Sequence, residues 1–415
     1  MVTKAEILAV GTELLMGQIA NTNAQYISAR LPDVGIGVYY HSVVGDNRER
    51  LRDVLRLAIS RSDLLITTGG LGPTKDDLTK ETIAELFDRR LITHQESLDR
   101  LKAFFNSLKR PMTENNLKQA NMPDGAIVLR NNNGTAPGCI MEEKGKIVIM
   151  LPGPPSEMKV MFEEGVIPFL SERSDSRIVS RFLRIFGIGE SSMEDAIKDL
   201  IENQSNPTIA PYAKEGELAL RITARYPKDG GSKDLIAPIE EEIKKRLGVK
   251  VYSSNNKGLD EVVSEMLLET NTSIAIAESC TGGLISARLT ETPGISRVFN
   301  RGIISYSNQA KIEDLHVKKR TLERFGAVSR ETAIEMAKGV RNISETDLGL
   351  SVTGIAGPDG GSPEKPVGLV YIALDCREST ECKELNLWGS RNRIRNVTAL
   401  YAFDMIRRRL LERKD

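Results

Sequence analysis

Short apolar segments that read as β-strands alternate with helical segments toward both ends of this 415-residue chain, and glycine-rich loops follow several of them. Such alternation predicts parallel strand pairing with helices on both faces of a sheet. We therefore expect one α/β domain over residues 1–170 and a second over residues 256–415. Between them, residues 171–255 read as a small α+β domain without a catalytic motif, which we expect to serve as a spacer or dimerisation module.

The same patterns predict individual elements that the structure can test. They comprise a helix at Arg48–Arg61, a strand at Lys146–Leu151, a polar break at Ser171–Asp175, a strand at Ile303–Tyr306 and a closing amphipathic helix at Asn396–Leu411. Arg407, Arg408, Arg409 and Arg413 lie near the end of that last helix, where positive charge is electrostatically favourable. We expect these arginines to form a solvated face.

Composition excludes several classes of function. Lys+Arg 57 and Asp+Glu 57 give a net charge of zero, which provides no overall electrostatic attraction to nucleic acids. Aromatic residues make up 5% of the chain, which argues against binding of single strands by base stacking. The four cysteines have no C-x-x-C spacing and the three histidines no H-x-x-x-H spacing, which argues against zinc and thioredoxin-like chemistry. We see neither a signal peptide nor an apolar run of about 18 residues, and expect a cytoplasmic protein without membrane or nucleic-acid partners.

Three loops in the first domain follow predicted strands, at Gly11–Gly17, Val44–Asn47 and Gly69–Asp77. Ligands of parallel α/β sheets bind beyond the carboxyl ends of the strands, and glycines let backbone N–H groups approach phosphates. Asp46, Asp76 and Asp77 would supply oxygen ligands for Mg²⁺, or a carboxylate that positions a nucleophile. A fourth loop at Leu151–Met158 would cap the same pocket.

The strongest local signal in the last domain is the sequence AESCTGGL at Ala277–Leu284, where a strand passes into a helix. This junction exposes a nucleophile and aims helix N–H groups at developing negative charge. Ser279 and Cys280 are both candidate nucleophiles. His316 lies in a solvent-facing context, so a Ser–His–Asp triad is unsupported, and Lys311 offers an alternative base if burial lowers its pKa.

Two further loops complete this second constellation. The glycine-rich segment Thr353–Gly361 follows a predicted strand and is suited to hold a phosphate or a ribose. The segment Trp388–Arg395 brings guanidinium groups to the start of the last helix, and arginine binds phosphate in a bidentate manner.

Taken together, these motifs resemble the CinA family over nearly the whole chain. The resemblance rests on GTELLMGQIANTNAQY, VVGDN, TTGGLGPTKDDLT, NNLKQA and LPGPPSEM in the first domain, and on AESCTGG, YSNQAK, TGIAGPDGG, KPVG and RNRIR in the last. The middle segment is matched by position alone. One departure is visible, because Thr353 stands where the family commonly has serine.

For the first domain, the resemblance implies a molybdopterin-binding fold of the MoaB/MogA type. It also implies metal-dependent hydrolysis of ADP-ribose to AMP and ribose 5-phosphate, with a divalent cation such as Mg²⁺ held by Asp46, Asp76 and Asp77. Asp46 and Asp77 would act in catalysis. The residues implied to bind substrate are Gly11, Thr12, Glu13, Asn23, Gly69, Gly70, Gly72 and Thr74.

For the last domain, the resemblance implies a nicotinamide mononucleotide amidase of the PncC type, which needs no cofactor and releases ammonia and nicotinic acid mononucleotide. It favours Ser279 over Cys280 as the nucleophile, with Lys311 as its base and Tyr306 assisting. The residues implied to bind substrate are Thr281, Gly282, Gly283, Thr353, Gly354, Gly357, Arg391 and Arg395.

Two classes of function remain after this comparison. The chain is expected to be a bifunctional, homodimeric pyridine-nucleotide salvage enzyme, because both implied substrates are fragments of NAD. The alternative is a competence-associated interaction protein without both activities. A molybdopterin enzyme is supported by fold analogy alone, which is a weak argument for function.

Overall fold

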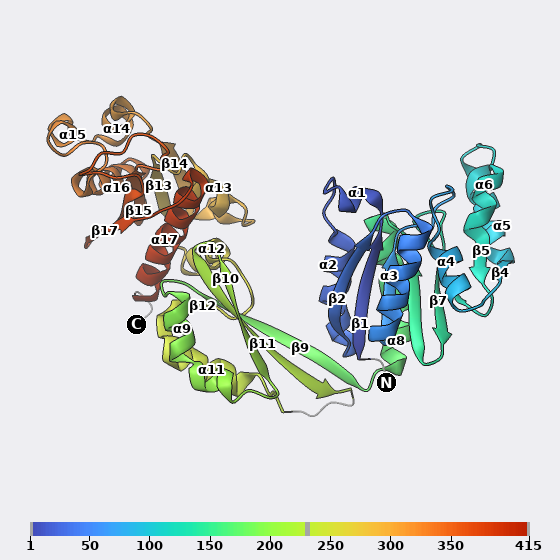
Figure 1. Ribbon diagram of the computed structural model, residues 1–415. Helices are drawn as coiled ribbons and strands as arrows, with labels where there is room; N and C mark the ends of the chain where they lie inside the picture. The colour runs from blue at the N-terminus through green and yellow to red at the C-terminus, as the bar shows by residue number, and fades with distance from the viewer. Residues whose placement is uncertain (1–2, 229–232, 413–415) are drawn as a thin grey trace. The chain divides into compact units, whose positions relative to one another are not determined.

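The computed structural model describes residues 3–228 and 233–412. The chain divides into two compact units, Met1–Val179 with Ala224–Lys233, and Ser180–Thr223 with Asp234–Asp415. The first unit holds the N-terminal α/β domain, and the second holds the C-terminal α/β domain with most of the middle segment (Figure 1). Among the described residues, no helix combines the length and the apolar composition that a membrane crossing requires.

The N-terminal sheet has six strands in the order β2-β1-β3-β8-β7-β6. Four of them run parallel, namely β1 (Lys4–Val10), β2 (Gly37–Val44), β3 (Leu64–Thr68) and β8 (Lys146–Leu151). The other two, β7 (Gly138–Glu143) and β6 (Ile127–Leu129), are antiparallel. The predicted parallel pairing is confirmed for these four strands. β6 and β7 extend the sheet with antiparallel pairing, because the two-residue turn between β7 and β8 permits only a hairpin.

Helices cover both faces of this sheet because its strands direct apolar side chains to either side. Ala5 and Ile7 of β1 pack with the helices of one face, and Leu8 and Val10 with those of the other. The first face carries α2 (Thr22–Arg30), α7 (Pro155–Met161) and α8 (Ile167–Arg173), and the second carries α3 (Arg48–Arg61) and α4 (Thr79–Leu86). The predicted bounds of α3 and β8 are confirmed.

The remaining N-terminal helices and strands flank this layered core. They are α1 (Thr12–Leu15), α5 (Gln95–Ser107), α6 (Glu114–Leu117) and the small antiparallel pair β4 (Leu91–Thr93) and β5 (Asn121–Pro123). Met122 of β5 still contributes to the core. The polar break predicted at Ser171–Asp175 begins only at Ser174, because α8 continues to Arg173. The guanidinium of Arg173 stacks on Phe169 and pairs with Glu142 at 2.8 Å, which holds the last helical turn in place.

The middle segment forms a four-stranded sheet in the order β10-β11-β9-β12. Its strands are β9 (Ser176–Ile185), β10 (Thr208–Lys214), β11 (Glu217–Pro227) and β12 (Val251–Ser253), and its helices are α9 (Glu190–Ala196), α10 (Lys198–Glu202) and α11 (Ala237–Leu247). β10 pairs antiparallel with β11, and β12 with β9. This confirms an α+β arrangement between the two α/β domains.

The C-terminal sheet has five strands in the order β14-β13-β15-β16-β17. β13 (Ile274–Glu278), β14 (Phe299–Ile304) and β15 (Leu348–Gly354) are parallel, whereas β16 (Leu369–Asp375) and β17 (Thr380–Asn386) are antiparallel. The helices are α12 (Leu259–Thr270), α13 (Leu284–Thr290), α14 (Asn308–Leu315), α15 (Lys319–Phe325), α16 (Arg330–Ser344) and α17 (Arg391–Glu412). This sheet is also mixed, since consecutive hairpins join β15 to β17.

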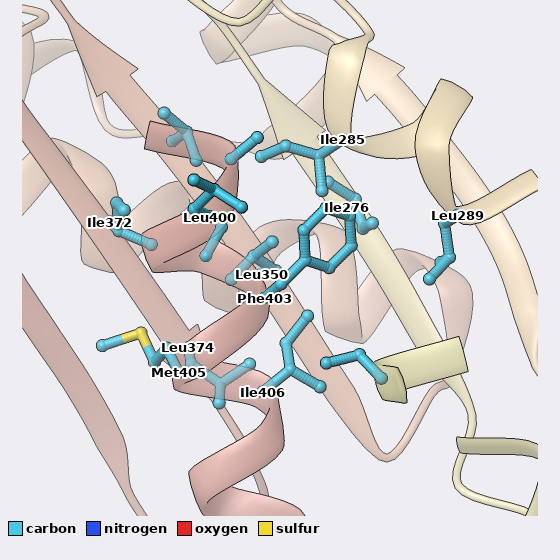
Figure 2. Close-up of a cluster of buried hydrophobic side chains, with 14 of the residues drawn as sticks. Ile276, Ile285, Leu289, Leu350, Ile372, Leu374, Leu400, Phe403, Met405 and Ile406 are labelled. Carbon is cyan, nitrogen blue, oxygen red and sulfur yellow. The ribbon is translucent and has the colours of Figure 1, made fainter. Parts of the chain in front are cut away.

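Helix α17 is the centre of the C-terminal core. Figure 2 shows Leu400, Phe403, Met405 and Ile406 of α17 packed among apolar side chains of the sheet and of α13. The helix also packs against α12. The predicted closing helix is therefore present, but it is buried around most of its circumference rather than amphipathic.

Two of the sequence predictions for this domain are wrong in detail. The strand predicted at Ile303–Tyr306 ends earlier, because the pairing of β14 with β13, which shifts register after Phe299, stops at Ile304 and the chain then turns into α14. Arg407 is not solvated. It is 3% exposed and pairs with the buried carboxylate of Asp404 at 2.6 Å, whereas Arg408 is exposed as expected. Arg413 lies outside the described residues.

Candidate active sites

The C-terminal candidate site is built on the turn between β13 and α13, at residues 279–283. Gly282 and Gly283 have φ angles of 60° and 90°, a region that residues with a side chain rarely adopt. Two consecutive left-handed residues turn the chain sharply from the end of the strand into the helix. Ser279 is held at the end of β13, where its N–H donates to the carbonyl of Val352 at 3.0 Å.

Glu278 organises this turn, and the sequence analysis missed it. Its fully buried carboxylate accepts hydrogen bonds from the N–H groups of Gly283 (2.9 Å), Ile285 (3.2 Å) and Ser286 (2.8 Å). These are orphan donors of a helix N-terminus, and a carboxylate there is electrostatically favourable. An acidic residue at the junction between a predicted strand and a predicted helix was an available signal. The bond to Gly283 also means that this glycine's N–H is occupied rather than free for a ligand.

Ser279 and Lys311 meet at the centre of the site. The Nζ of Lys311 lies 3.2 Å from the Oγ of Ser279 and donates to the carbonyl oxygen of Ser305 at 2.7 Å. Lys311 is 1% exposed and Ser279 is 8% exposed. Burial lowers the pKa of Lys311 from its ordinary value, since desolvation disfavours the charged amine. A serine hydroxyl beside a desolvated amine has the arrangement of an activated nucleophile and its base.

The other nucleophile that the sequence leaves open is disfavoured. Cys280 is buried, and desolvation raises the pKa of its thiol to about 12. The thiol therefore stays protonated near neutral pH, and a protonated thiol is a poor nucleophile. His316 is exposed and follows the last residue of α14, as its solvent-facing context predicted.

The arginines of α17 brace the loops of this site. Arg395 donates through Nη2 to the carbonyl oxygen of Thr281 at 2.7 Å. Arg391 donates to the carbonyl oxygen of Gly357 at 2.7 Å and to the hydroxyl of Tyr306 at 3.0 Å. The structure thus places Tyr306, which is 61% exposed, against Arg391. Arg391 is also exposed, so it keeps a surface accessible to a ligand.

Several predicted binding groups are already engaged within the protein. The hydroxyl of Thr353 donates to the carbonyl oxygen of Ala327 at 2.8 Å, and Gly354 pairs with Val370 in the sheet. The N–H of Gly282 donates to the carbonyl oxygen of Ser279 at 3.1 Å. In contrast, the hydroxyls of Thr281 and Ser305 are buried without a hydrogen-bond partner among the described residues. These two hydroxyls are the unsatisfied polar groups next to the serine–lysine pair.

The N-terminal candidate site is a cavity of about 460 Å³ at the carboxyl ends of the parallel strands. Loops that follow β1, β2, β3 and β8 all contribute to it, as the sequence predicted. The cavity brings together most of the predicted residues, namely Gly11, Glu13, Asp46, Gly69, Gly70, Gly72, Thr74, Asp76 and Asp77. Asn23 lies instead in an adjoining cavity of about 290 Å³ that shares Val10, Glu13, Gly153 and Pro154 with the first.

Two aspartates of this cavity repeat one hydrogen-bond pattern. Asp46 accepts through Oδ2 from the N–H and the hydroxyl of Thr12, at 3.0 and 2.8 Å. Asp77 accepts through Oδ2 from the N–H and the hydroxyl of Thr74, at 2.8 and 2.6 Å. Thr12 therefore positions a carboxylate rather than lining the cavity. In both cases the bonds use Oδ2.

The glycines of the third loop are required by close packing. Gly69 has a φ angle of 98°, and a Cβ atom there would collide with the carbonyl oxygen of Val10. The backbone of this loop therefore lies against the end of β1. This close approach leaves no room for a side chain at Gly69, whose own N–H donates to the carbonyl oxygen of Leu151 at 3.0 Å.

Polar residues of a second layer, which the sequence analysis did not assign, support the cavity. Lys80 is buried, and its Nζ donates to the carbonyl oxygen of Gln119 at 2.9 Å. Gln119 in turn donates to the hydroxyl of Thr135 at 3.0 Å, and both residues line the cavity. The motif NNLKQA was part of the resemblance, but nothing local indicates which of its residues reaches the site.

A preassembled metal cluster is not part of this site. Within residues 3–228 and 233–412, no three or more histidine, cysteine or acidic side chains lie together so as to hold a metal ion. Asp46, Asp76 and Asp77 line one cavity but do not form such a cluster. The carboxylates still fit Mg²⁺, which is usually bound by one or two carboxylates together with substrate phosphates.

Fold and sites together define a three-part α/β protein with a molybdopterin-binding-like domain at its N-terminus. Family models match a probable molybdopterin binding domain over residues 6–172, a damage-inducible protein CinA KH domain over 180–253 and a CinA C-terminal domain over 256–410. The chain belongs to the CinA family.

Relatives match this chain over nearly their full length. A putative competence-damage inducible protein of Acetivibrio thermocellus is 60% identical over 410 residues, covering 99% of each chain. A CinA-like protein of Kosmotoga olearia is 54% identical over 408 residues, covering 98% of this chain and 99% of the relative. A solved competence/damage inducible protein from Agrobacterium tumefaciens is 42% identical, with a TM-score of 0.35, and covers 37% of this chain and 97% of that one.

Proposed function

We propose that this chain is a bifunctional hydrolase of pyridine-nucleotide fragments. In this proposal the C-terminal domain hydrolyses nicotinamide mononucleotide to nicotinic acid mononucleotide and ammonia. The N-terminal domain hydrolyses ADP-ribose to AMP and ribose 5-phosphate. The substrates come from the resemblance to the CinA family, and the observation that carries the proposal is the buried contact of 3.2 Å between Lys311 Nζ and Ser279 Oγ.

The first half of the amidase reaction uses the serine–lysine pair directly. With Lys311 neutral, the hydroxyl of Ser279 donates its proton to Nζ while Oγ forms a bond to the carboxamide carbon. The carbonyl electron pair moves onto oxygen, and the unpartnered hydroxyl of Thr281 is the nearby buried donor that we assign to this oxyanion. The carbon–nitrogen bond then breaks, and ammonia leaves with the proton returned by Lys311.

The second half regenerates the enzyme. A water molecule donates a proton to Lys311 as its oxygen attacks the acyl carbon, and the ester bond to Ser279 Oγ breaks with return of that proton to Oγ. The exposed guanidinium of Arg391, already oriented by Gly357 and Tyr306, is our candidate for the substrate phosphate. Arg395 acts through the loop, since its guanidinium supports the carbonyl of Thr281.

The amidase proposal is tested by incubating the full chain with nicotinamide mononucleotide and measuring ammonia and nicotinic acid mononucleotide together. We expect both products in equal amounts from the wild type. Cys280→Ala is expected to retain the rate within about threefold, because its thiol stays protonated and buried. A wild type that releases no ammonia would refute the amidase and favour the interaction protein, and an inactive Cys280→Ala that still folds would overturn the choice of nucleophile.

The N-terminal proposal rests on the cavity of about 460 Å³ and its two oriented carboxylates. Glycine N–H groups of the Gly69–Asp77 loop are suited to hold the diphosphate of ADP-ribose. Asp46 and Asp77 would hold a divalent cation, and that cation would neutralise charge on the diphosphate. Thr12 and Thr74 orient these carboxylates.

Asp77→Asn tests this second activity, because asparagine can still accept hydrogen bonds from Thr74 but lacks the negative charge. We expect at least a tenfold loss of AMP release from ADP-ribose with Mg²⁺, measured by chromatography, while ammonia release from nicotinamide mononucleotide is unchanged. Asp53→Asn, on the exposed face of α3, is the matched control and should retain full activity. Equal rates for the wild type and Asp77→Asn would remove Asp77 from the mechanism, and no AMP from the wild type would refute the activity.

A further inference from the structure

The cavity that adjoins the N-terminal site has a different chemical character from the glycine-loop cavity. Its volume is about 290 Å³, and its walls are largely apolar, with Leu14, Ile19, Ala20, Pro154 and Pro155 among them. It shares Val10, Glu13, Gly153 and Pro154 with the cavity to which we assign the diphosphate. A ligand with its diphosphate among the glycines therefore has an apolar compartment directly beside it.

One polar group in this compartment is unsatisfied. Asn23 is 8% exposed, and its Nδ2 donates to the carbonyl oxygen of Gly153 at 2.7 Å. Because that carbonyl requires a donor, the amide nitrogen must face Gly153, which leaves Oδ1 as an acceptor. Among the described residues, Asn23 Oδ1 is buried and accepts no hydrogen bond. A buried acceptor without a partner destabilises the protein, and a ligand that donates a hydrogen bond to it removes that cost.

We infer that this compartment is the base subsite of the N-terminal site and that Asn23 selects a purine with a 6-amino group. Apolar walls favour a planar base over a ribose, because a ribose would leave its hydroxyls without partners. An exocyclic amine donates a hydrogen bond, which Asn23 Oδ1 can accept. Hypoxanthine carries a carbonyl oxygen at the same position, and two acceptors facing one another repel. This inference rests on the proposed ADP-ribose activity and adds selection for adenine to it.

The test compares two nucleotides that differ at this one position. Using isothermal titration calorimetry with the full chain, we expect AMP to bind roughly ten- to a hundredfold more tightly than IMP, the range that one unsatisfied buried acceptor produces. Asn23→Ala should bind both nucleotides with equal affinity, because the discriminating acceptor is gone. Equal binding of AMP and IMP by the wild type, or binding of neither, would overturn the inference.

Asn23→Ala also removes the hydrogen bond to Gly153. We therefore add a second variant that leaves this hydrogen bond intact. Ala20→Trp introduces a large side chain at an exposed position in the wall of the compartment and should abolish AMP binding. Gln18→Trp, at a nearby exposed position, is the matched control and should bind AMP normally. Retained AMP binding by a folded Ala20→Trp would place the base elsewhere and overturn the inference.

A kinetic comparison separates this inference from the reaction that it rests on. If the wild type hydrolyses ADP-ribose and its hypoxanthine analogue at equal kcat/KM, the base subsite is refuted and the reaction stands. If the wild type prefers AMP to IMP in binding but hydrolyses neither dinucleotide analogue, the subsite stands and the proposed activity fails.

Discussion

Ser279→Ala and Lys311→Met are each expected to reduce ammonia release from nicotinamide mononucleotide at least about a thousandfold. Ser279 supplies the bond-forming oxygen, and Lys311 is the basic group next to it, at 3.2 Å. Removing either member of a nucleophile–base pair leaves the other without a function. The double variant should therefore be no slower than the slower single variant. The measurement is initial-rate ammonia release, with AMP release from ADP-ribose as an internal control that both variants should retain.

The pH dependence of the amidase provides a second readout for Lys311. Only the neutral amine can accept the proton of Ser279, so kcat/KM should rise with pH through the pKa of Lys311. Burial places that pKa below the ordinary 10.5, and the rising limb should therefore lie below that of an exposed lysine. A rate that falls as pH rises over this range would contradict the assignment of Lys311 as base.

Lys311→Met should also stabilise the folded protein at neutral pH. A lowered folded-state pKa means that the buried amine destabilises the fold fully below that pKa, and that this cost disappears as pH rises past the ordinary 10.5. Methionine fills a similar volume without a charge. If the variant is inactive yet at least as stable as the wild type, unfolding cannot explain its loss of activity. If it is both inactive and destabilised, the loss of activity is explained by a structural role of Lys311.

Asp404→Ala is expected to cause the largest loss of stability, about 3–5 kcal/mol in the free energy of unfolding. Its carboxylate accepts from Arg407 at 2.6 Å and from Arg408 at 2.7 Å, and it is 4% exposed. Removing it takes away the carboxylate that neutralises the buried guanidinium of Arg407. The hydrogen bond from Arg407 Nη2 to the carbonyl oxygen of Val249 remains, at 2.7 Å. Urea denaturation of the full chain, followed by circular dichroism, measures the effect.

Two comparisons isolate the buried ion pair. Arg408→Ala removes an exposed partner of the same carboxylate and should cost less than about 1 kcal/mol, because surface ion pairs contribute little. The double variant Asp404→Leu with Arg407→Met replaces both charges by apolar groups and should recover most of the stability that Asp404→Ala loses. If Asp404→Ala and Arg408→Ala cost the same, burial of Arg407 is not what makes Asp404 important.

Local patterns in the sequence predicted the architecture and the place of each candidate site. Glycine loops at successive strand ends indicated the N-terminal cavity, and AESCTGGL indicated the strand-to-helix turn that holds Ser279. Errors arose where tertiary contacts override a local pattern. The polar residues Asn300 and Arg301 lie in a strand because β14 pairs with β13, and Arg407 is buried because Asp404 neutralises it. No local signal distinguishes these cases from a loop and a solvated arginine.

By itself, the sequence determined which residue types stand at the strand ends, because glycine, serine and aspartate there follow from turn geometry and strand periodicity. Only the tertiary structure decided which of them meet. Lys311 reaches Ser279 from α14, and Arg395 reaches the carbonyl of Thr281 from α17. Asn23 is left with an oxygen that has no partner among the described residues. Contacts between residues distant in sequence depend on sheet order and packing, which no short segment encodes.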